Sequence, residues 1–494
     1  MVFFPNCHRI VDTRRETGQD TGRVSPLNFL DPYGGVAMSR RKNRRQFLLN
    51  TGVLGVTTVS GGSVLTALSQ QVNVPNVLSD IQEKPALLGG KPVLSRSWPS
   101  WPMVHKSDED AIMEVLRARR WYRNRSVEEF EERYAELNSA RFCIATASGT
   151  TALFTSLGAL GIGPGDEVIV PPFTFMATVT VVLLHYALPV FVDSDPDTFL
   201  MDPKKLEAAI TPRTKAIIPV HIGGNVANLD EILAVAERHK IPVIGDACQA
   251  HLAEWRGKSA GSWGTTGCYS FQLSKNLCSG EGGAILTNDE ALADACFAFH
   301  NCYRKRPKAT GSTNLAFGRN GNFRMTEFQG ALLLSQMEGI RERADLRSDN
   351  ATYLTKLLSE IPGISPARQY PQCTRNAYHL FMFRYDPAEF SGLPRNRFVN
   401  ALRAEGVPCS PGYSPLNKEK FLLDALRSEP YIRVYGREVI DAWPSKNECP
   451  ENDKLCEQSV WFYQNVLLTD HQTMEKIALA INKIKKHAGD LRKG

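Results

Sequence analysis

Apolar positions along the chain follow two spacings, one typical of buried strands and one typical of amphipathic helices. Short apolar runs predict strands at 141–147, 167–170, 189–192, 216–220 and 242–244. Between such runs, residues 178–186 and 230–239 repeat their apolar positions at helical spacing. Strands that alternate with helices of about ten residues are typical of parallel sheets. We therefore predict an α/β fold whose doubly wound, mainly parallel sheet is covered on both faces.

A second region follows this pattern. Thr326 resembles a helix N-cap, and a helical pattern runs from it to about Leu358. Beyond it the pattern predicts a strand, two helices and a turn, at 378–385, 395–405, 470–486 and 408–415. A chain of 494 residues is long enough for two domains. We expect a large domain over 105–340 and a smaller C-terminal α/β domain over 341–494.

The front of the chain resembles an export signal. We expect residues 1–37 to be unstructured or to precede the true start at Met38. Basic residues and then a moderate apolar run follow, and R-R-Q-F-L at 44–48 resembles the twin-arginine motif. We predict a twin-arginine signal over 38–70 and a linker over 71–104. A weak membrane anchor is the alternative, although glycines in the apolar run make a stable span less favourable.

Charge and cysteine content limit the possible partners. The net charge of +6 is modest, and no basic stripe with interleaved aromatic residues is present, so nucleic acid is not an expected partner. Among the eleven cysteines there is no C-x-x-C pair and no zinc-ligand spacing, and we expect no metal site. Several cysteines crowd 248–302, where buried thiols are typical of a reducing compartment. A cytoplasmic location therefore stays open beside export to the periplasm.

One stretch, 267–286, carries the candidate chemistry. Its lysine, Lys275, lies between an aromatic, hydroxyl-bearing run and a glycine-rich turn that leads into a short apolar strand. Burial among apolar residues disfavours the charged form of a lysine, and a neutral amine is the form that attacks a carbonyl group. A surface lysine beside a hairpin is the alternative for this residue.

Two further features would place polar groups at the same edge of the sheet. The strand at 141–147 leads into S-G-T-T at 148–151, where a helix N-terminus offers backbone N–H groups to a phosphate. Asp246 directly follows another predicted strand. Either feature alone also suits a simple helix cap. Ligands of open α/β sheets bind beyond the carboxyl ends of the strands, so these groups could converge with Lys275.

Together these residue types fit pyridoxal phosphate (PLP). This cofactor needs a lysine for its aldehyde, a carboxylate for its pyridine nitrogen, a flat side chain against its ring and donors for its phosphate. Lys275, Asp246 and Phe175 fill the first three roles. The turn at 148–150 and Ser270 fill the fourth.

The chain also resembles a known family over roughly 88–490. The matching pieces are A-S-G-T-T-A-L at 147–153, G-D-E-V-I-V-P-P-F-T-F at 165–175, P-V-H at 219–221, G-D-A-C-Q-A-H at 245–251, S-F-Q-L-S-K-N at 270–276, G-E-G-G-A-I-L-T-N-D at 280–289 and G-N-F-R-M-T-E-F-Q-G-A at 321–331. They resemble the DegT-type (StrS-like) sugar aminotransferases, which are fold-type I PLP enzymes. L-L-G-G-K-P-V near the front resembles the branch that includes aminocyclitol and aminohydroxybenzoate enzymes.

The resemblance implies roles for the residues that match around the cofactor ring. Lys275 would form the Schiff base with the cofactor, and Asp246 would keep the ring nitrogen protonated. Gln249 would approach the ring hydroxyl, while Phe175 would stack on the face of the ring.

It also implies how the phosphate and the substrate are bound. Gly149, Thr150 and Ser270 would hold the phosphate. Asn322 would reach that phosphate from the neighbouring subunit, so the resemblance implies a homodimer with shared active sites. Two side chains in small-domain segments would border the substrate, namely His379 and Tyr413.

Two segments depart from the family pattern on the substrate side. The loop that the family writes H-L-Y-G is H-I-G-G at 221–224, without the tyrosine. The segment that it writes H-Y-x-P-L-H is G-Y-S-P-L-N at 412–417, without either histidine. The identity of the acceptor is therefore open.

By resemblance, the protein is expected to be a ping-pong aminotransferase. Glutamate or glutamine would donate an amino group to a keto sugar or keto cyclitol, in nucleotide-sugar and polysaccharide biosynthesis or in aminocyclitol biosynthesis. Two alternatives stay open: a dehydratase of the same fold and a non-enzymatic sensor that retains the fold. Relatives with dehydratase chemistry replace the lysine by histidine, whereas this chain has Lys275.

Overall fold

The computed structural model describes residues 83–307, 309 and 318–493. The predicted signal over 38–70, the segment 1–37 and the first part of the predicted linker lie outside the described residues. The described residues form one compact unit. Within the described ranges, no helix combines the length and the apolar character that crossing a bilayer requires.

The first sheet has the strand order β3-β2-β4-β5-β8-β9-β1. Parallel bridges from Ile217 to Val243 and from Val220 to Asp246 join its three-stranded and four-stranded parts. Only β9 runs against its neighbours, so the predicted mainly parallel sheet is confirmed. The strands are β1 (Phe142–Thr146), β2 (Glu167–Val170), β3 (Leu188–Phe191), β4 (Thr214–Ile217), β5 (Ile244–Asp246), β8 (Thr266–Ser270) and β9 (Gly283–Thr287).

Helices cover both faces of this sheet, as predicted. Ile144 and Cys268 pack with α3, α4 and α7 on one face, whereas their neighbours Ala145 and Tyr269 pack with α2 and α8 on the other. Successive side chains of a strand point to opposite faces, which is why adjacent residues belong to different cores. The helices are α2 (Arg125–Leu137), α3 (Gly149–Ala159), α4 (Ala177–Leu184), α6 (Leu229–His239), α7 (Glu290–His300) and α8 (Glu327–Gln336).

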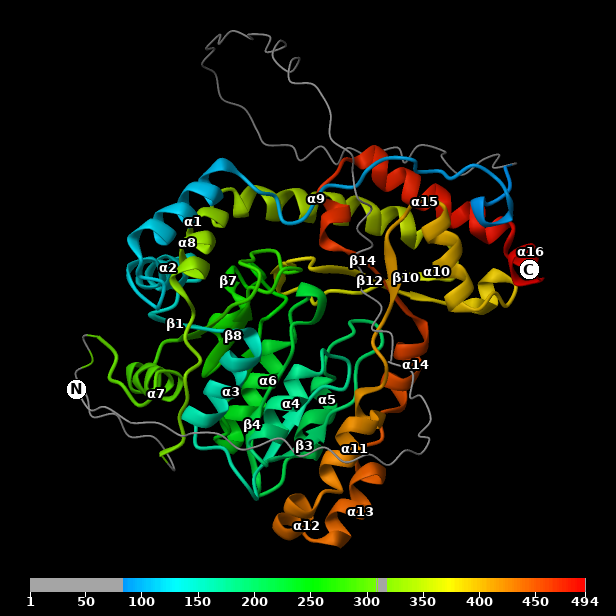
Figure 1. The fold of residues 1–494 in the computed structure, drawn as a ribbon. Helices are drawn as coiled ribbons and strands as arrows, with labels where there is room; N and C mark the ends of the chain where they lie inside the picture. Colours follow the sequence, from blue (N-terminus) through cyan, green and yellow to red (C-terminus); the bar gives the residue numbers. More distant parts are fainter. Residues whose placement is uncertain (1–82, 308, 310–317, 494) are drawn as a thin grey trace, which may run out of the picture. The chain divides into compact units, whose positions relative to one another are not determined.

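A second, antiparallel sheet has the strand order β10-β12-β14-β13. Its core is shared with four helices, of which α9 reaches it from the first sheet (Figure 1) and the last is α16 (Ala488–Lys493). The helix predicted to run from Thr326 to Leu358 is interrupted at Gly339, whose φ is 68°. The elements are β10 (Ile364–Pro366), β12 (Leu380–Tyr385), β13 (Cys409–Pro411), β14 (Ser459–Tyr463), α9 (Ile340–Ser359), α10 (Arg395–Ala404) and α15 (His471–Lys486). The predicted turn at 408–415 therefore contains a short strand.

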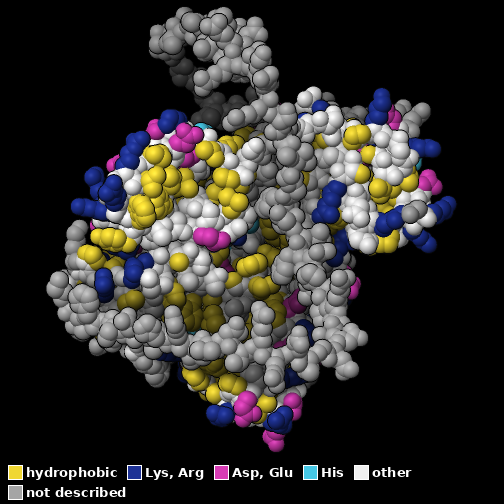
Figure 2. All heavy atoms as spheres, viewed as in Figure 1, with side chains coloured by type: hydrophobic (Ala, Val, Ile, Leu, Met, Phe, Trp, Pro, Cys, Tyr) yellow, Lys and Arg dark blue, Asp and Glu magenta, His cyan; other side chains and the backbone are white. Residues whose placement is uncertain are grey.

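Apolar side chains gather on the outer side of the helices near the front of the described chain (Figure 2). Met113 and Leu116 of α1 (Lys106–Ala118) are exposed there, as are Trp121 and Tyr122 in the turn that follows. α1 itself packs on α8. The surface formed by these four side chains is called the α1 patch below.

Four helices of the C-terminal region, which the sequence pattern did not predict, pack on the first sheet. They are α11 (Lys420–Leu426), α12 (Glu429–Tyr435), α13 (Arg437–Lys446) and α14 (Pro450–Gln458). Tyr431 and Trp443 belong to the same core as Leu188 of the edge strand β3. Trp443 Nε1 donates to Pro189 O at 2.8 Å, and Phe191 N donates to Asn447 Oδ1 at 2.7 Å. This segment thus binds the free edge of the sheet, although it lies within 341–494.

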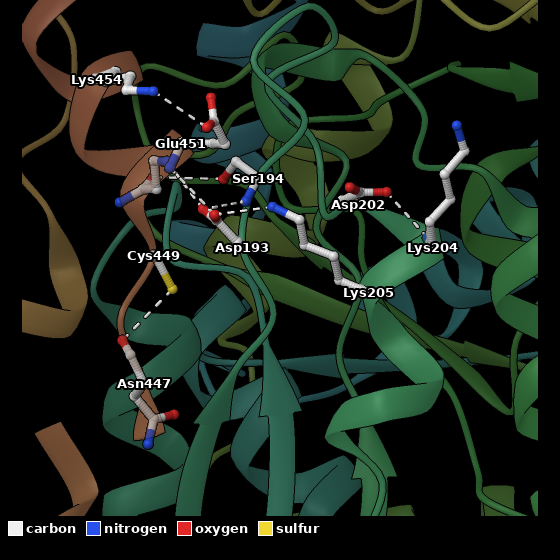
Figure 3. Close-up of polar contacts among 10 residues, drawn as sticks. Asp193, Ser194, Asp202, Lys204, Lys205, Asn447, Cys449, Glu451 and Lys454 are labelled. Carbon is white, nitrogen blue, oxygen red and sulfur yellow. Dashed lines mark hydrogen bonds and ion pairs between the residues drawn. The ribbon is translucent and has the colours of Figure 1, made fainter. Parts of the chain in front are cut away.

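A buried carboxylate anchors this segment (Figure 3). Asp193, two residues beyond β3, accepts hydrogen bonds from Glu451 N at 3.2 Å and Asn452 N at 2.9 Å, in the first turn of α14. It also accepts from Ser194 N and pairs with Lys205 Nζ at 3.0 Å. A helix N-terminus binds negative charge well, so Asp193 stabilises α14 from outside the helix.

Candidate active site

The carboxyl edge of the first sheet brings the predicted cofactor residues together. Asp246 is the last residue of β5, and Ser270 is the last residue of β8. Gly149 begins α3 just after β1, which runs in the same direction as β8 because both pair antiparallel with β9. Carboxyl ends of parallel strands meet at one edge of a sheet, and the predicted convergence follows from this topology.

Lys275 lies in the loop that joins β8 to β9. Burial lowers the pKa of its amine, while the charges of Cys248 and Asp246 act in the opposite direction. Asp246 is therefore within electrostatic range of the amine. Among the described residues, none forms a hydrogen bond or ion pair with Lys275 Nζ. The arrangement gives an amine that can lose its proton and attack a carbonyl group.

Asp246 is held in one orientation although only 5% of its surface is exposed. Thr178 Oγ1 donates to Oδ2 at 2.9 Å, and Cys248 N donates to Oδ1 at 3.1 Å. Hydrogen bonds to a carboxylate are stronger than neutral ones and fix its geometry. Thr178 was not predicted; its only sequence signal is a hydroxyl in the first turn of the helix that follows β2.

The turn before α3 combines a helix cap with a close backbone approach. Ser148 Oγ accepts from Thr151 N at 3.1 Å, and Ser148 N donates to Thr151 Oγ1 at 2.9 Å, so Ser148 is an N-cap. A Cβ atom on Gly149 would lie 2.7 Å from Ser270 Cβ and 2.8 Å from Cys248 Sγ. Glycine is thus required here, and the N–H groups of the first turn, Thr150 included, face the carboxyl edge.

Gln249 links the cofactor side to the second sheet. Its Oε1 accepts from Gly223 N at 2.8 Å, and its Nε2 donates to Tyr413 Oη at 3.1 Å. Tyr413 Oη therefore accepts from the amide and keeps its own proton for donation. Burial raises the pKa of Tyr413 to about 12, which keeps the hydroxyl neutral. Its ring is fixed by edge contacts with Phe173 and Trp461, at centroid distances of 5.4 and 5.0 Å.

His379 reaches the same region from the start of β12. Its Nδ1 lies 3.4 Å from Oδ1 of Asn276, the residue next to Lys275. Burial holds the pKa of His379 well below its usual range, and the charges of Lys275, His251 and Arg347 lower it further. The imidazole is therefore neutral at physiological pH.

Two predicted residues stand apart from these contacts. The Phe175 side chain is 55% exposed, and no ring contact to it occurs in the described part of the chain. Asn322 is exposed on a segment that bridges to Asn301. The roles that the resemblance implies for Phe175 and Asn322 remain predictions.

The structure gives physical reasons for both departures from the family pattern. Gly223 has φ 63°, and a Cβ atom there would lie 2.7 Å from Met382 Cε, so the tyrosine position is closed. A Cβ atom on Gly412 would lie 1.7 Å from Ser459 Oγ. Asn417 is buried and donates to Asn447 O at 2.9 Å, which ties it to the helical segment 420–458. Packing therefore occupies all three positions where the family has tyrosine or histidine.

The assembled groups fit PLP. The oriented carboxylate of Asp246 suits the pyridine nitrogen, and the amine of Lys275 is not paired with a described residue. At Gly149 a side chain would close the space before the helix N-terminus, where a phosphate binds well.

Comparison with known proteins agrees with this geometry. Residues 102–431 match the model of the DegT/DnrJ/EryC1/StrS aminotransferase family. The chain is 38% identical over 421 residues to an L-glutamine:2-deoxy-scyllo-inosose aminotransferase of Streptoalloteichus tenebrarius, covering 82% of this chain and 99% of the relative. It is also 38% identical over 416 residues to the enzyme of that name from Streptomyces kanamyceticus, covering 81% and 97%.

Solved structures show the same fold. 3-Amino-5-hydroxybenzoic acid synthase superposes with a TM-score of 0.68 at 30% identity, covering 78% of this chain and 98% of that chain. An aminotransferase from Psychrobacter cryohalolentis superposes with a TM-score of 0.69 at 29% identity, covering 80% and 100%. Sequence, site geometry and fold agree, and the chain belongs to the DegT/DnrJ/EryC1/StrS aminotransferase family.

Proposed function

We propose that this protein, a PLP-dependent aminotransferase by its family, moves the amino group of L-glutamine or L-glutamate to a keto cyclitol. The observation that carries the proposal is the meeting of Lys275 and Asp246 at the carboxyl edge of the first sheet. Relatives that cover most of the chain are named for L-glutamine and 2-deoxy-scyllo-inosose, which supports this donor and acceptor.

Each group of site residues has a separate role in the reaction. Bound PLP supplies an electron sink for the carbon that loses its proton. Asp246 keeps the ring nitrogen protonated, and Gly149, Thr150 and Ser270 bind the phosphate. With the donor bound, the Lys275 amine would take the proton from the donor Cα, because burial favours the neutral form of the amine.

The substrate side supports a neutral, hydroxyl-rich acceptor. Gln249, Tyr413 and His379 are uncharged under physiological conditions and offer hydrogen bonds through an amide, a hydroxyl and an imidazole. Such groups suit the hydroxyls of a cyclitol ring. These three side chains themselves carry no positive charge toward the acceptor.

The decisive experiment compares wild type with Lys275→Ala. Wild type is expected to show the visible absorbance of bound PLP, to lose it on addition of L-glutamine, and to aminate 2-deoxy-scyllo-inosose. Lys275→Ala is expected to lose the absorbance and the turnover. Turnover in Lys275→Ala would refute the proposal. A wild type that binds PLP but responds to no amino donor would instead favour a sensor.

We further propose a homodimer that completes the site. The α1 patch is an exposed apolar surface of the kind that a second copy covers, and Asn322 is exposed as a donor to a partner's phosphate should be. Mixing Lys275→Ala with Asn322→Ala subunits should restore activity, since one site in each mixed dimer is then intact. No recovery on mixing would refute shared sites.

For location we propose export by the twin-arginine route, which transports folded proteins. None of the ten cysteines in the described part of the chain forms a disulfide, as expected for folding in a reducing compartment. Cell fractionation should find wild type in the periplasm and the Arg44→Lys, Arg45→Lys double variant in the cytoplasm. Equal distribution of both would refute export by this signal.

A further inference from the structure

A buried guanidinium without an acidic partner lies close to the site. Arg347 of α9 is only 1% exposed, and within the described chain no carboxylate pairs with it. Burial lowers its pKa to about 9, which still leaves the group charged at neutral pH. A buried charge is stable only when groups of opposite polarity surround it, and Arg347 lacks, among the described residues, the anionic partner that its burial would require.

Neutral groups contact the Arg347 guanidinium along one edge and over one face. Nε and Nη2 both donate to Gln464 Oε1, the former at 2.9 Å, and the Trp101 ring lies 5.3 Å from Cζ. An amide oxygen and an aromatic face are weak substitutes for an anion. Among the described residues, Nη1 has no hydrogen-bond acceptor.

Two separate sets of contacts connect Arg347 to the lysine loop. Tyr463 of β14 pairs with Leu380 of β12. Gln464 follows the first of these residues and His379 precedes the second, so Gln464 and His379 lie at the same end of the second sheet. His379 in turn meets Asn276, next to Lys275. On the other side, Trp101 Nε1 donates at 3.0 Å to Leu273 O, two residues before Lys275.

The backbone before His379 is also held in an uncommon conformation. Tyr378 has φ 45°, which is rare for a bulky residue, and Asn276 Nδ2 donates to the preceding carbonyl, Ala377 O, at 2.7 Å. Such conformations persist where the surrounding structure imposes them, often at ligand sites. The positive charges of both Lys275 and Arg347 lower the pKa of His379 and of His251, so both charges act on the region around these histidines.

We propose that Arg347 binds the α-carboxylate of the amino donor. The inference rests on the proposed function, because glutamine and glutamate carry that group and a keto cyclitol does not. The planar guanidinium matches a carboxylate in a bidentate geometry. The site proposed for the cofactor phosphate lies elsewhere, at Gly149 and Ser270 of the first sheet. Arg347 therefore acts in the donor half of the reaction alone.

The test uses two probes that differ only at the carboxylate. Calorimetry of the holoenzyme compares 4-carbamoylbutanoate, which is glutamine without its amino group, with the neutral pentanediamide. Wild type should bind the first about 10- to 100-fold more tightly, the value of one charged hydrogen-bonded contact. Arg347→Met should lose this discrimination. In turnover it should raise KM for L-glutamine by a similar factor and leave KM for the keto acceptor unchanged.

Arg343→Met is the matched control. Arg343 lies one turn earlier on α9 and donates to two backbone carbonyls, Gln336 O and Glu338 O, so its loss should leave the discrimination intact. Equal binding of both probes by wild type, or full discrimination in Arg347→Met, would overturn the inference. Since the wild-type comparison needs no variant, misfolding of Arg347→Met leaves the test decisive. A wild type that discriminates between the probes but transfers no amine would refute the proposed function and not this site.

Discussion

Two buried aspartates of the first sheet occupy similar places and do different things. Asp246 ends β5, and Asp193 lies two residues beyond β3. Their exposed fractions are 5% and 6%. Asp193 is surrounded by three backbone N–H groups and Lys205, all from the protein. Among the described residues, Asp246 accepts from Thr178 Oγ1 and one backbone N–H, and its other contact is the Cys248 thiol.

The difference shows that a position after a strand does not by itself make a catalytic acid. The role of such an aspartate depends on whether the protein itself or a bound ligand supplies the remaining hydrogen-bond partner of the carboxylate. At Asp193 the helical segment 420–458 takes the space beyond the carboxyl edge and uses the charge as a helix cap (Figure 3). At Asp246 the neighbouring loop instead brings the amine of Lys275 within electrostatic range, without an ion pair between the two groups.

The largest expected effect is on activity at Asp246. Asp246→Asn keeps one acceptor, for Cys248 N, and its NH2 group can donate to the Thr178 hydroxyl, but it cannot hold a proton on the ring nitrogen. We therefore expect kcat/KM to fall by about 1,000-fold, the usual scale for a lost charge contact in the reaction. The melting temperature should change little. Stopped-flow measurement of the half-reaction with L-glutamine checks the rate, and calorimetry checks the stability.

Asp193→Asn is the matched control for that experiment, since it makes the same change in a similarly buried carboxylate. A comparable loss of activity in both variants, with both still folded, would remove the distinction between the two aspartates.

The next effect is on stability at Asp193. Asp193→Asn removes the negative charge that the first turn of α14 and Lys205 bind, and we expect a loss of about 2 kcal/mol in the free energy of unfolding. Urea unfolding measures it. Asp202→Asn, at the half-buried N-cap of a short helix close by, should lose about 1 kcal/mol or less. Equal losses would mean that α14 does not depend on Asp193.

The smallest effect concerns Lys205. Burial is the largest single influence and lowers its pKa, but the hydrogen bond to Asp193 and the nearby negative charges together outweigh it, so the pKa is raised. A raised pKa stabilises the fold fully below the unfolded value, and this contribution is lost as the pH rises through the folded pKa. Because the side chain is 43% exposed, Lys205→Met should lose no more than about 1 kcal/mol near pH 7. The difference between variant and wild type should vanish in unfolding curves well above pH 10.5. A difference that grows with pH would contradict the ion pair.

Local signals were enough to predict the cofactor side of the site. Each of its groups follows a strand within a few residues, and a parallel sheet brings such positions to one edge. Asp246 and Ser270 could be placed in this way because the strands before them are short, apolar and bounded by turn residues. The break at Gly339 was missed because apolar spacing continues through it.

The remaining parts depend on contacts between residues far apart in the chain. Tyr431 and Trp443 bind carbonyl groups of Ala187 and Pro189, about 250 residues away, and no local pattern signals such a partner. The helices that carry them are short and take their stability from this docking. Arg347 and Thr178 were missed for the same reason, since their neighbours come from other elements.

The docking of the 420–458 segment on β3 has a consequence for handling the protein. On the outer side of that strand, Pro189 has no N–H to offer, its carbonyl is bound by Trp443, and Phe191 N is bound by Asn447. A foreign β-strand would find few main-chain groups there with which to pair, so this border of the sheet is a poor template for cross-molecular β-assembly at high concentration.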